Sequence, residues 1–271
     1  MIRFEDVDFV YPTGVRAIQG VSLSIESGEF VGVIGHSGAG KTTLAKLATS
    51  LLKPTRGRVL IDGKDSKSLP ASEAARIVSY VFQNPDMMIF SQTVRDEVAF
   101  ALRNLGFPES EIEKRVQEAL RAVDLNKPLD TPPQTLSFGE KHRLAIASVL
   151  VMGSRALVLD EPTTGLDYGR SLMLFDTLNA LNASGKTIVV ITHDLDLLAR
   201  YASRIIVLEK GRVIRDGSTL DVLGDADFLE SHGFMLTHVQ QVARRLGVKA
   251  ITPSKLAEEL ADRLHGLSSP R

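Results

Sequence analysis

The stretch FVGVIGHSGAGKTT, residues Phe30 to Thr43, decides the fold of this chain. It opens with a short apolar run rich in β-branched residues, a composition typical of a buried strand. The rest places glycines, Lys41 and Thr42 at the spacing of a phosphate-binding loop (P-loop), and a helical pattern follows from Lys41 to Leu52. This motif works between a strand and a helix, so a chance glycine-rich turn is the less favoured alternative.

The chemistry expected of this loop follows from its glycines and from its position before a helix. Glycine has no Cβ atom, so successive backbone N–H groups can turn toward phosphate oxygens, and the helix N-terminus adds partial positive charge. Lys41 should reach the β- and γ-phosphates of ATP, and the Thr42 hydroxyl should bind Mg²⁺. The residues expected to bind the nucleotide here are Gly35, His36, Ser37, Gly38, Ala39, Gly40, Lys41, Thr42 and Thr43.

Further apolar runs alternate with helical patterns along the chain. They predict strands that are buried on both faces of a largely parallel sheet, at residues 78–82, 156–159, 187–191 and 205–208. Helical stretches, such as the one from Gly169 to Ala183, separate several of these runs. The alternation predicts an α/β fold with helices on both faces of the sheet.

The middle of the chain departs from this alternation. Between Thr93 and Met152 the pattern is helical and contains no convincing strand. Ser110 and Glu113 predict a capping box at the start of one of these helices. We therefore expect a helical subdomain, about residues 86–153, inserted into the sheet domain.

The C-terminal part also lacks strand patterns. Val239, Val242, Ala243 and Leu246 would share one face of a helix, and Thr252-Pro253 would open another as cap and first helical residue. We expect a sheet domain over residues 1–216, followed by a helical appendage over residues 217–271.

Composition limits the class of protein. The chain has 271 residues, of which 44% are hydrophobic, enough for a substantial core. Its 32 basic and 33 acidic residues nearly balance, which gives no electrostatic case for a nucleic-acid partner. It contains no cysteine, which excludes disulfides and thiolate metal sites. No apolar run approaches bilayer length and the N-terminus does not resemble a signal peptide, so we expect a soluble cytoplasmic chain.

The predicted strand that begins at Ala156 ends in two adjacent carboxylates, Asp160 and Glu161. Asp160, at the carboxyl end of the strand, could hold Mg²⁺ through its water. Glu161 points elsewhere and could orient and deprotonate the attacking water. A solvated acidic turn is the alternative, and the P-loop in the same chain favours the catalytic interpretation.

Further motifs follow in a fixed order. They are Gln83 at the end of a predicted strand, LSFGE at residues 136–140, TGLD at residues 164–167, and His193 after another strand. Together with Tyr11 before the P-loop, this set resembles that of the ATP-binding subunits of ABC transporters over roughly residues 1–215. The resemblance implies the P-loop NTPase fold of an ABC ATPase, with a mixed sheet.

The resemblance also assigns roles to single residues. Tyr11 would stack on the adenine, with an ordinary strand aromatic as the alternative. Gln83 would touch Mg²⁺ or the lytic water. His193 would contact the γ-phosphate, although a lone histidine at a strand end is more often structural. Asp167 would lie between two ATP sites.

The LSFGE run resembles the family's signature motif, whose commonest form is LSGGQ. Ser137 and Gly139 would bind the γ-phosphate of ATP held by another subunit, with their helix N-terminus facing it. Phe138 and Glu140 depart from the family pattern, because they replace a glycine and a glutamine. Phe138 must aim away from the phosphates. Since Ser137 and Gly139 are retained, we expect a working site.

The stretch from Phe82 to Phe90, FQNPDMMIF, narrows the resemblance to ATPases of energy-coupling factor (ECF) transporters. These drive uptake of vitamins or of cobalt and nickel ions, and their helical appendage helps two ATPases pair. Met88 departs from the pattern, because many members carry a glutamine there. The apolar run from Met87 to Phe90 could belong to the core, but we favour a surface that contacts a partner.

The resemblance implies a peripheral subunit on the cytoplasmic face of the cell membrane. Its partners would be a second ATPase subunit, identical or related, a transmembrane coupling subunit and a substrate-binding membrane subunit, with no nucleic acid. One alternative is a soluble ABC-type ATPase that acts on nucleic acid or the ribosome, although such proteins usually carry tandem ATPase domains, coiled-coil insertions or basic tails. Another is a regulatory ATP-binding subunit with negligible turnover.

Overall fold

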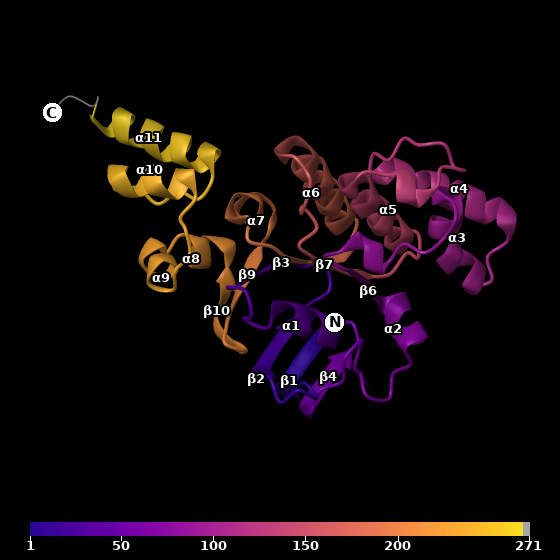
Figure 1. Ribbon diagram of the computed structural model, residues 1–271. Coiled ribbons are helices and arrows are strands. Elements are labelled where there is room, and N and C mark those ends of the chain that lie inside the picture. The colour runs from indigo at the N-terminus through magenta and orange to yellow at the C-terminus, as the bar shows by residue number, and fades with distance from the viewer. Residues whose placement is uncertain (268–271) are drawn as a thin grey trace.

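The computed structural model describes residues 1–267, which form two sheets and a set of surrounding helices (Figure 1). The strands are β1 Ile2–Val10, β2 Arg16–Ile25, β3 Phe30–Ile34, β4 Arg56–Ile61, β5 Lys64–Asp65, β6 Val78–Val81, β7 Ala156–Asp160, β8 Thr187–Ile191, β9 Arg204–Glu209 and β10 Arg212–Ser218. The helices are α1 Lys41–Ala48, α2 Ala71–Ile77, α3 Val94–Asn104, α4 Glu109–Ala122, α5 Phe138–Leu150, α6 Tyr168–Ala183, α7 Leu195–Tyr201, α8 Thr219–Leu223, α9 Ala226–Ser231, α10 His238–Leu246 and α11 Pro253–Leu267, with short 3-10 turns at Pro85–Met87 and Pro133–Thr135. Residues 268–271 of the expected appendage lie outside the described residues.

The main sheet has the strand order β10-β9-β3-β8-β7-β6. All neighbours from β9 to β6 pair in parallel, and β10 is antiparallel to β9. The strands expected from the apolar runs are therefore confirmed, and β10 makes the sheet mixed. Parallel pairing brings the carboxyl ends of β3, β7 and β8 to one edge, where the P-loop begins after Ile34.

The central strands are buried on both faces because successive side chains enter two different cores. In β3, Val31 and Val33 pack into a core shared with α1 and the smaller sheet. Phe30 and Ile34 pack on the other side, into a core built largely from α3 to α7. That second core also contains residues of α8 and α9, so the first part of the appendage packs directly on the sheet domain.

The smaller sheet, in the order β2-β1-β4-β5, is antiparallel, and the apolar-run pattern does not predict it. Its strands alternate between buried and exposed residues. In β1, for example, Ile2 and Phe4 are buried while Arg3 is exposed. A sheet with one solvated face needs no continuous apolar run. Register shifts around Val7 also interrupt the alternation in β1.

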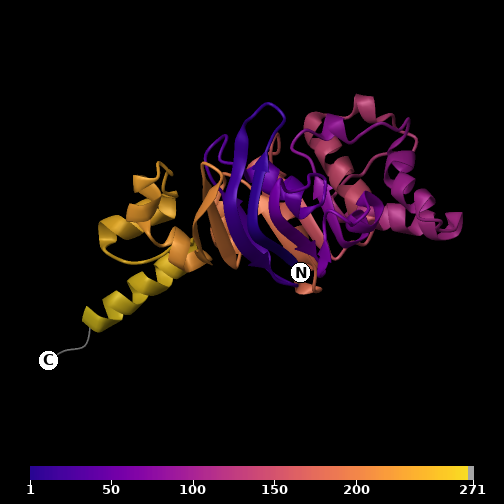
Figure 2. The same cartoon turned by 90° about the horizontal axis from the view of Figure 1, so that it is seen from below.

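Helices α3, α4 and α5 lie between β6 and β7 in the chain and at the opposite end of the molecule from α10 and α11 (Figures 1 and 2). The capping box expected at Ser110 and Glu113 is wrong. Helix α4 begins two residues earlier than a cap at Ser110 would place it, because Pro108 has φ −69° and ψ 145° and takes the cap position without a side-chain hydrogen bond. Glu113 instead accepts a hydrogen bond from Nε of Arg95 at 2.8 Å.

The elements after β10 are helical, as expected. Pro253 is the first residue of α11, and the Thr252 hydroxyl accepts a hydrogen bond from the backbone N–H of Lys255 at 3.3 Å. The expected apolar face of α10 is divided. Ala243 is buried, whereas 44% of Val242 and 43% of Leu246 is exposed.

A buried histidine lies in helix α5. His142 is fully buried, and neither of its ring nitrogens has a hydrogen-bond partner among the described residues. Burial lowers the pKa of His142 to about 4, because the apolar core disfavours the charged ring. The folded chain therefore holds this ring neutral over a pH range in which an unfolded chain would protonate it.

This burial predicts a specific loss of stability in acid. An unfolded histidine takes up its proton near pH 6.5, and folded His142 does so only near pH 4, so the stability that depends on the neutral ring falls as pH drops through this window. The slope contributed by one such group approaches about 1.4 kcal/mol per pH unit. His142→Leu should remove this contribution. Denaturant unfolding at pH 7, 6 and 5 measures it.

Ile146→Val, in the same buried helix α5, is the matched control, because it alters packing without changing a titratable group. It should lower the unfolding free energy by the same amount at all three pH values. Equal pH slopes in the His142→Leu variant and the wild type would contradict the assignment.

Candidate functional site

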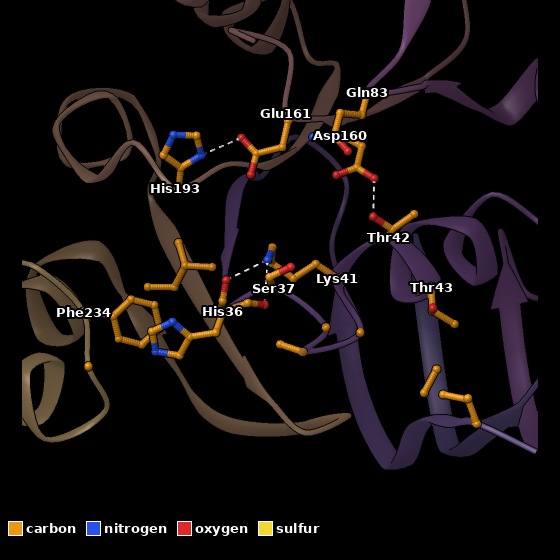
Figure 3. Close-up of a pocket in the computed structure, with 18 of the residues that line it drawn as sticks. His36, Ser37, Lys41, Thr42, Thr43, Gln83, Asp160, Glu161, His193 and Phe234 are labelled. Atoms are coloured by element: carbon orange, nitrogen blue, oxygen red, sulfur yellow. Dashed lines mark hydrogen bonds and ion pairs between the residues drawn. The ribbon is translucent and has the colours of Figure 1, made fainter. Parts of the chain in front are cut away.

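A cavity of about 700 Å³ opens at the carboxyl edge of the main sheet. It is lined by fourteen residues expected from the sequence to form the site, namely Tyr11, the nine residues from Gly35 to Thr43, Gln83, Asp160, Glu161 and His193. Figure 3 shows most of these side chains around the P-loop. The structure thus brings together residues that lie up to 182 positions apart in the sequence, from Tyr11 to His193.

The P-loop is shaped by close backbone contacts. Gly40 has φ +104°, and a Cβ atom at this position would lie 2.5 Å from the carbonyl oxygen of Ala17, so only glycine fits there. Helix α1 starts at the next residue, Lys41. The ammonium group of Lys41 donates to the carbonyl oxygens of Gly35 at 2.6 Å and His36 at 3.0 Å. Two carbonyl groups of the loop therefore hold the Lys41 ammonium near the N-terminus of α1.

Asp160, the last residue of β7, is 2% exposed and accepts two hydrogen bonds on the same oxygen. Thr42 Oγ1 donates to Oδ2 of Asp160 at 2.6 Å, and the Tyr80 hydroxyl donates to it at 2.9 Å. Burial and the neighbouring carboxylate raise the pKa of Tyr80 well above its usual range, which keeps its phenol a donor. Tyr80 was not expected here, because nothing in the sequence distinguishes it from other buried strand aromatics.

The donors at this point suit Mg²⁺. Thr42 offers a hydroxyl, Asp160 a carboxylate and Gln83 an amide oxygen, and hard oxygen ligands are those that Mg²⁺ takes. Within residues 1–263, whose side chains the structure describes, His, Cys, Asp and Glu do not gather in threes as they would in an all-protein metal cage. Mg²⁺ typically uses one or two protein groups together with substrate phosphates, so this sparse set fits it.

Glu161 has different partners from Asp160. Its φ of +49° turns the backbone into the left-handed region, which a non-glycine residue adopts only at some strain. Its N–H still bonds to the Ile191 carbonyl at 2.8 Å, so the turn is held against β8. The side chain lies 3.0 Å from Nδ1 of His193, whose ring is 84% exposed. As expected from the sequence, the two neighbouring carboxylates face different groups.

Tyr11 lies at the other end of the cavity, directly after β1. Its hydroxyl is 3.0 Å from Oγ1 of Thr43, and its ring packs edge-on against Phe9 with the ring centroids 4.9 Å apart. The side chain is partly buried: it packs against the core of the smaller sheet and also lines the cavity. This placement is compatible with stacking on a base, which stays a prediction.

Three expected site residues do not line this cavity: Ser137, Gly139 and Asp167. Ser137 is the N-cap of α5 and forms a capping box with Glu140, whose carboxylate accepts from the Ser137 N–H at 2.9 Å and from its hydroxyl at 3.0 Å. The hydrogen bond from the Ser137 N–H, together with Nζ of Lys127 3.0 Å from Oε1 of Glu140, lowers the pKa of Glu140 to about 2. Asp167 similarly caps α6.

Phe138, which replaces the usual glycine of the signature motif, packs against a glycine of the TGLD run. Gly165 has φ +75°, and a Cβ atom on it would lie 2.5 Å from Cδ1 of Phe138. The ring of Phe138 therefore lies against the backbone of Gly165. A Cβ on Gly139 would likewise lie 3.0 Å from the Leu166 side chain. The signature run and the TGLD run of one chain thus pack closely, and Phe138 needs the glycine opposite it.

Three cavity residues come from a part of the chain that the motifs do not mark: Gly233, Phe234 and Met235. They lie between α9 and α10, in the expected appendage. No sequence signal connects them to the P-loop, because they follow it by about 190 positions and belong to no recognised pattern.

The fold and the cavity define a nucleotide-binding protein of the P-loop class. The chain belongs to the ABC transporter family, whose model matches residues 18–164. It is therefore an ABC ATPase domain with the mixed sheet and inserted helices described above, and the expected class and fold are confirmed.

Within the ABC transporter family, the chain is similar to several individual proteins. The energy-coupling factor transporter ATP-binding protein EcfA of Methanocaldococcus jannaschii is 40% identical over 93% of this chain and 91% of its own length. The structure of cbiO1 from Clostridium perfringens, described as part of the ABC transporter complex cbiONQ, is 34% identical with a TM-score of 0.76 and covers 90% of this chain and 98% of that one. A dimeric ATP-binding cassette solved with ADP and Pi is 32% identical with a TM-score of 0.76, covering 81% and 99%.

Other relatives are longer than this chain. An ABC transporter relative from Caldanaerobacter subterraneus is 42% identical over 91% of this chain, but the match covers 43% of that protein. The matches to relatives from Methanosarcina acetivorans and Methanosarcina mazei cover 45% and 40% of their length. The chain therefore spans less than half the length of these relatives.

The contact between Phe138 and Gly165 predicts that Gly165→Ala destabilises the fold. The new methyl group would overlap the ring, and such overpacking costs about 1 to 3 kcal/mol. Gly185→Ala is the matched control, because Gly185 also has positive φ but no atom within 4 Å of an added Cβ. Denaturant unfolding should show the larger loss for Gly165→Ala, and adding Phe138→Ala should restore part of it. Equal losses in the two glycine variants would refute the contact.

Proposed function

We propose that this chain is the ATP-hydrolysing subunit of an importer of the energy-coupling factor type, which takes up a metal ion such as cobalt or nickel, or a vitamin. The observation that carries the proposal is the joint placement, in one cavity, of the P-loop, the Thr42–Asp160 pair and the Glu161–His193 pair. The similarity to EcfA and to cbiO1 of the cbiONQ complex supports the transporter type.

Within the cavity, each group has a proposed role in hydrolysis. The P-loop N–H groups and Lys41 bind the β- and γ-phosphates of ATP. Thr42, Asp160 and Gln83 would hold Mg²⁺, which neutralises charge on the phosphates when bound. Glu161 accepts the proton of the attacking water as general base. His193 holds the Glu161 carboxylate in place through Nδ1 and lies exposed at the position proposed for the γ-phosphate.

We infer that a second subunit completes each ATP site. Ser137, Gly139 and Asp167 lie outside the cavity of their own chain, and Ser137, the exposed cap of α5, would face phosphates held by a partner. The negative charge of Glu140 would oppose such a phosphate, but Lys127 neutralises it locally. The dimeric cassette solved with ADP and Pi supports this pairing. The exposed apolar side of α10 gives the appendage a surface for the same contact.

The membrane partner would contact the loop after Gln83. Met87 and Phe90 are 68% and 63% exposed there, and the ring of Phe90 packs edge-on against that of Phe100 at 4.7 Å. Lys141 of α5 bonds to Asp86 at 2.8 Å, which ties this loop to the signature helix. None of the helices within residues 1–267 combines the length and apolar content needed to cross a bilayer. The surface thus links the nucleotide site to a place where a membrane subunit can bind.

Glu161→Gln tests the catalytic assignment. The amide keeps the shape of the carboxylate but cannot accept the proton of water, so hydrolysis should fall at least about 100-fold while ATP binding is retained. The variant should also accumulate as an ATP-bound dimer. Phosphate release, ATP titration and size-exclusion chromatography measure these effects. Glu118→Gln, on the exposed face of α4, should behave like the wild type, and unchanged hydrolysis in Glu161→Gln would remove Glu161 as the base.

Gentle purification from native membranes tests the proposed partners. The wild-type chain should bring hydrophobic membrane proteins with it, and Phe90→Ser should reduce their recovery because it removes an apolar contact. Met173→Ser alters a similarly exposed apolar residue on α6 and should not reduce it. Recovery of ribosomes or nucleic acid alone would overturn the transporter assignment in favour of a soluble ATPase.

A further inference from the structure

The segment from His232 to Met235, here called the linker segment, joins α9 to α10 and forms one wall of the nucleotide cavity. The segment belongs to the appendage, yet it contacts the P-loop directly. In Figure 3 the ring of Phe234 lies beside the ring of His36, on the side of the loop away from Thr43. The motifs that define the ATP site do not include this contact.

Two interactions join the linker segment to His36. The His36 and Phe234 rings are stacked, with centroids 4.9 Å apart and planes at 16°. Nε2 of His36 lies 2.6 Å from the carbonyl oxygen of His232. Because a carbonyl oxygen only accepts, the hydrogen bond requires a proton on Nε2. A Cβ atom on Gly233 would lie 3.2 Å from the same nitrogen, so the small residue between the two partners lets the ring approach.

The backbone of His36 links this contact to Lys41, the phosphate-binding lysine. The His36 carbonyl oxygen accepts from Nζ of Lys41 at 3.0 Å and from the N–H of Ala39 at 3.1 Å. The position of the His36 side chain therefore helps to set the carbonyl group that holds the Lys41 ammonium. His36 therefore contacts both the appendage, through its side chain, and Lys41, through its carbonyl oxygen.

The linker segment is itself anchored. The N–H of Phe234 bonds to the Leu229 carbonyl at 2.9 Å, and Phe234 packs against the main core. Immediately beyond the segment, Thr237 caps α10 in a capping box with the buried Gln240, which also donates to the carbonyl of Leu223. A segment fixed at both ends can hold the P-loop, whereas a mobile one could not.

We propose that the linker segment positions the P-loop for the phosphates of ATP, through the His36–Phe234 stack and the His36–His232 hydrogen bond. The inference rests on the proposed ATP binding at this cavity and adds a positioning residue, Phe234, and a side-chain role for His36. The appendage thereby acts on the affinity of its own chain for nucleotide. By thermodynamic linkage, bound ATP also favours the docked position of α9 and α10.

ATP affinity measured by fluorescence titration of the purified full chain tests this proposal. Loss of one aromatic pair at such a contact corresponds to a roughly three- to tenfold change in Kd. Phe234→Ala and His36→Ala should each raise the Kd for ATP by that amount. Phe234→Tyr keeps the stacked ring and should restore the wild-type Kd. The double variant should have the same Kd for ATP as the single variant with the higher Kd, because both substitutions remove the same interaction.

Phe107→Ala separates positioning from general destabilisation. Phe107 is a half-buried aromatic between α3 and α4, far from the cavity in the fold, and its ring packs under Arg115. This variant should lose thermal stability but keep the wild-type Kd for ATP. If Phe234→Ala fails to fold, His36→Ala still tests the stack, because it removes the P-loop side of the contact and leaves the appendage core intact.

Hydrogen exchange supplies a second readout that a purely structural contact would not change. ATP should slow amide exchange in residues 226–246 of the wild type, and His36→Ala should abolish this effect. Wild-type Kd values in both Phe234→Ala and His36→Ala, or a double variant whose effect is the product of the two, would overturn the inference. A wild-type chain that binds no ATP would instead contradict the proposed function, so the two failures are distinguishable.

Discussion

The nucleotide cavity depends on the register of three parallel strands that meet at Ile191. This residue, the last of β8, pairs with Val33 of β3 on one side and with Asp160 of β7 on the other. The P-loop, the two carboxylates and His193 each begin within two residues of these paired positions. A slip of one residue in either pairing would turn every side chain of that strand to the opposite face, and both faces are packed against a core. Burial of both faces therefore sets the register, and the register sets the site.

Within that frame, adjacent carboxylates acquire different properties from their surroundings. Asp160 continues the strand, is buried, and is held by the hydroxyls of Thr42 and Tyr80. Glu161 has a left-handed backbone and turns its carboxylate toward His193 at the rim. Two adjacent residues thus place one carboxylate in a buried position beside the P-loop helix and the other next to the exposed ring of His193.

The structure also connects this edge of the sheet to distant parts of the chain. Phe138 packs on Gly165, Lys141 bonds to Asp86, and His36 stacks on Phe234. These contacts join the signature helix to the TGLD run, the same helix to the loop after Gln83, and the appendage to the P-loop. Each of these contacts therefore joins elements of the fold that lie apart in the sequence.

The sequence by itself determined the P-loop, the five parallel strands, the helical insertion and most of the cavity residues, because each of these has a local pattern. A buried parallel strand reads as a continuous apolar run, and a phosphate-binding turn demands glycines at fixed spacing. The smaller sheet escaped this pattern because one of its faces is solvated, and the start of α4 was misplaced because Pro108 takes the cap position. Tyr80, Phe234 and the partner of Phe138 were decided only by the tertiary structure. Their roles come from contacts between residues far apart in the chain, and such contacts leave no periodicity in the sequence around them.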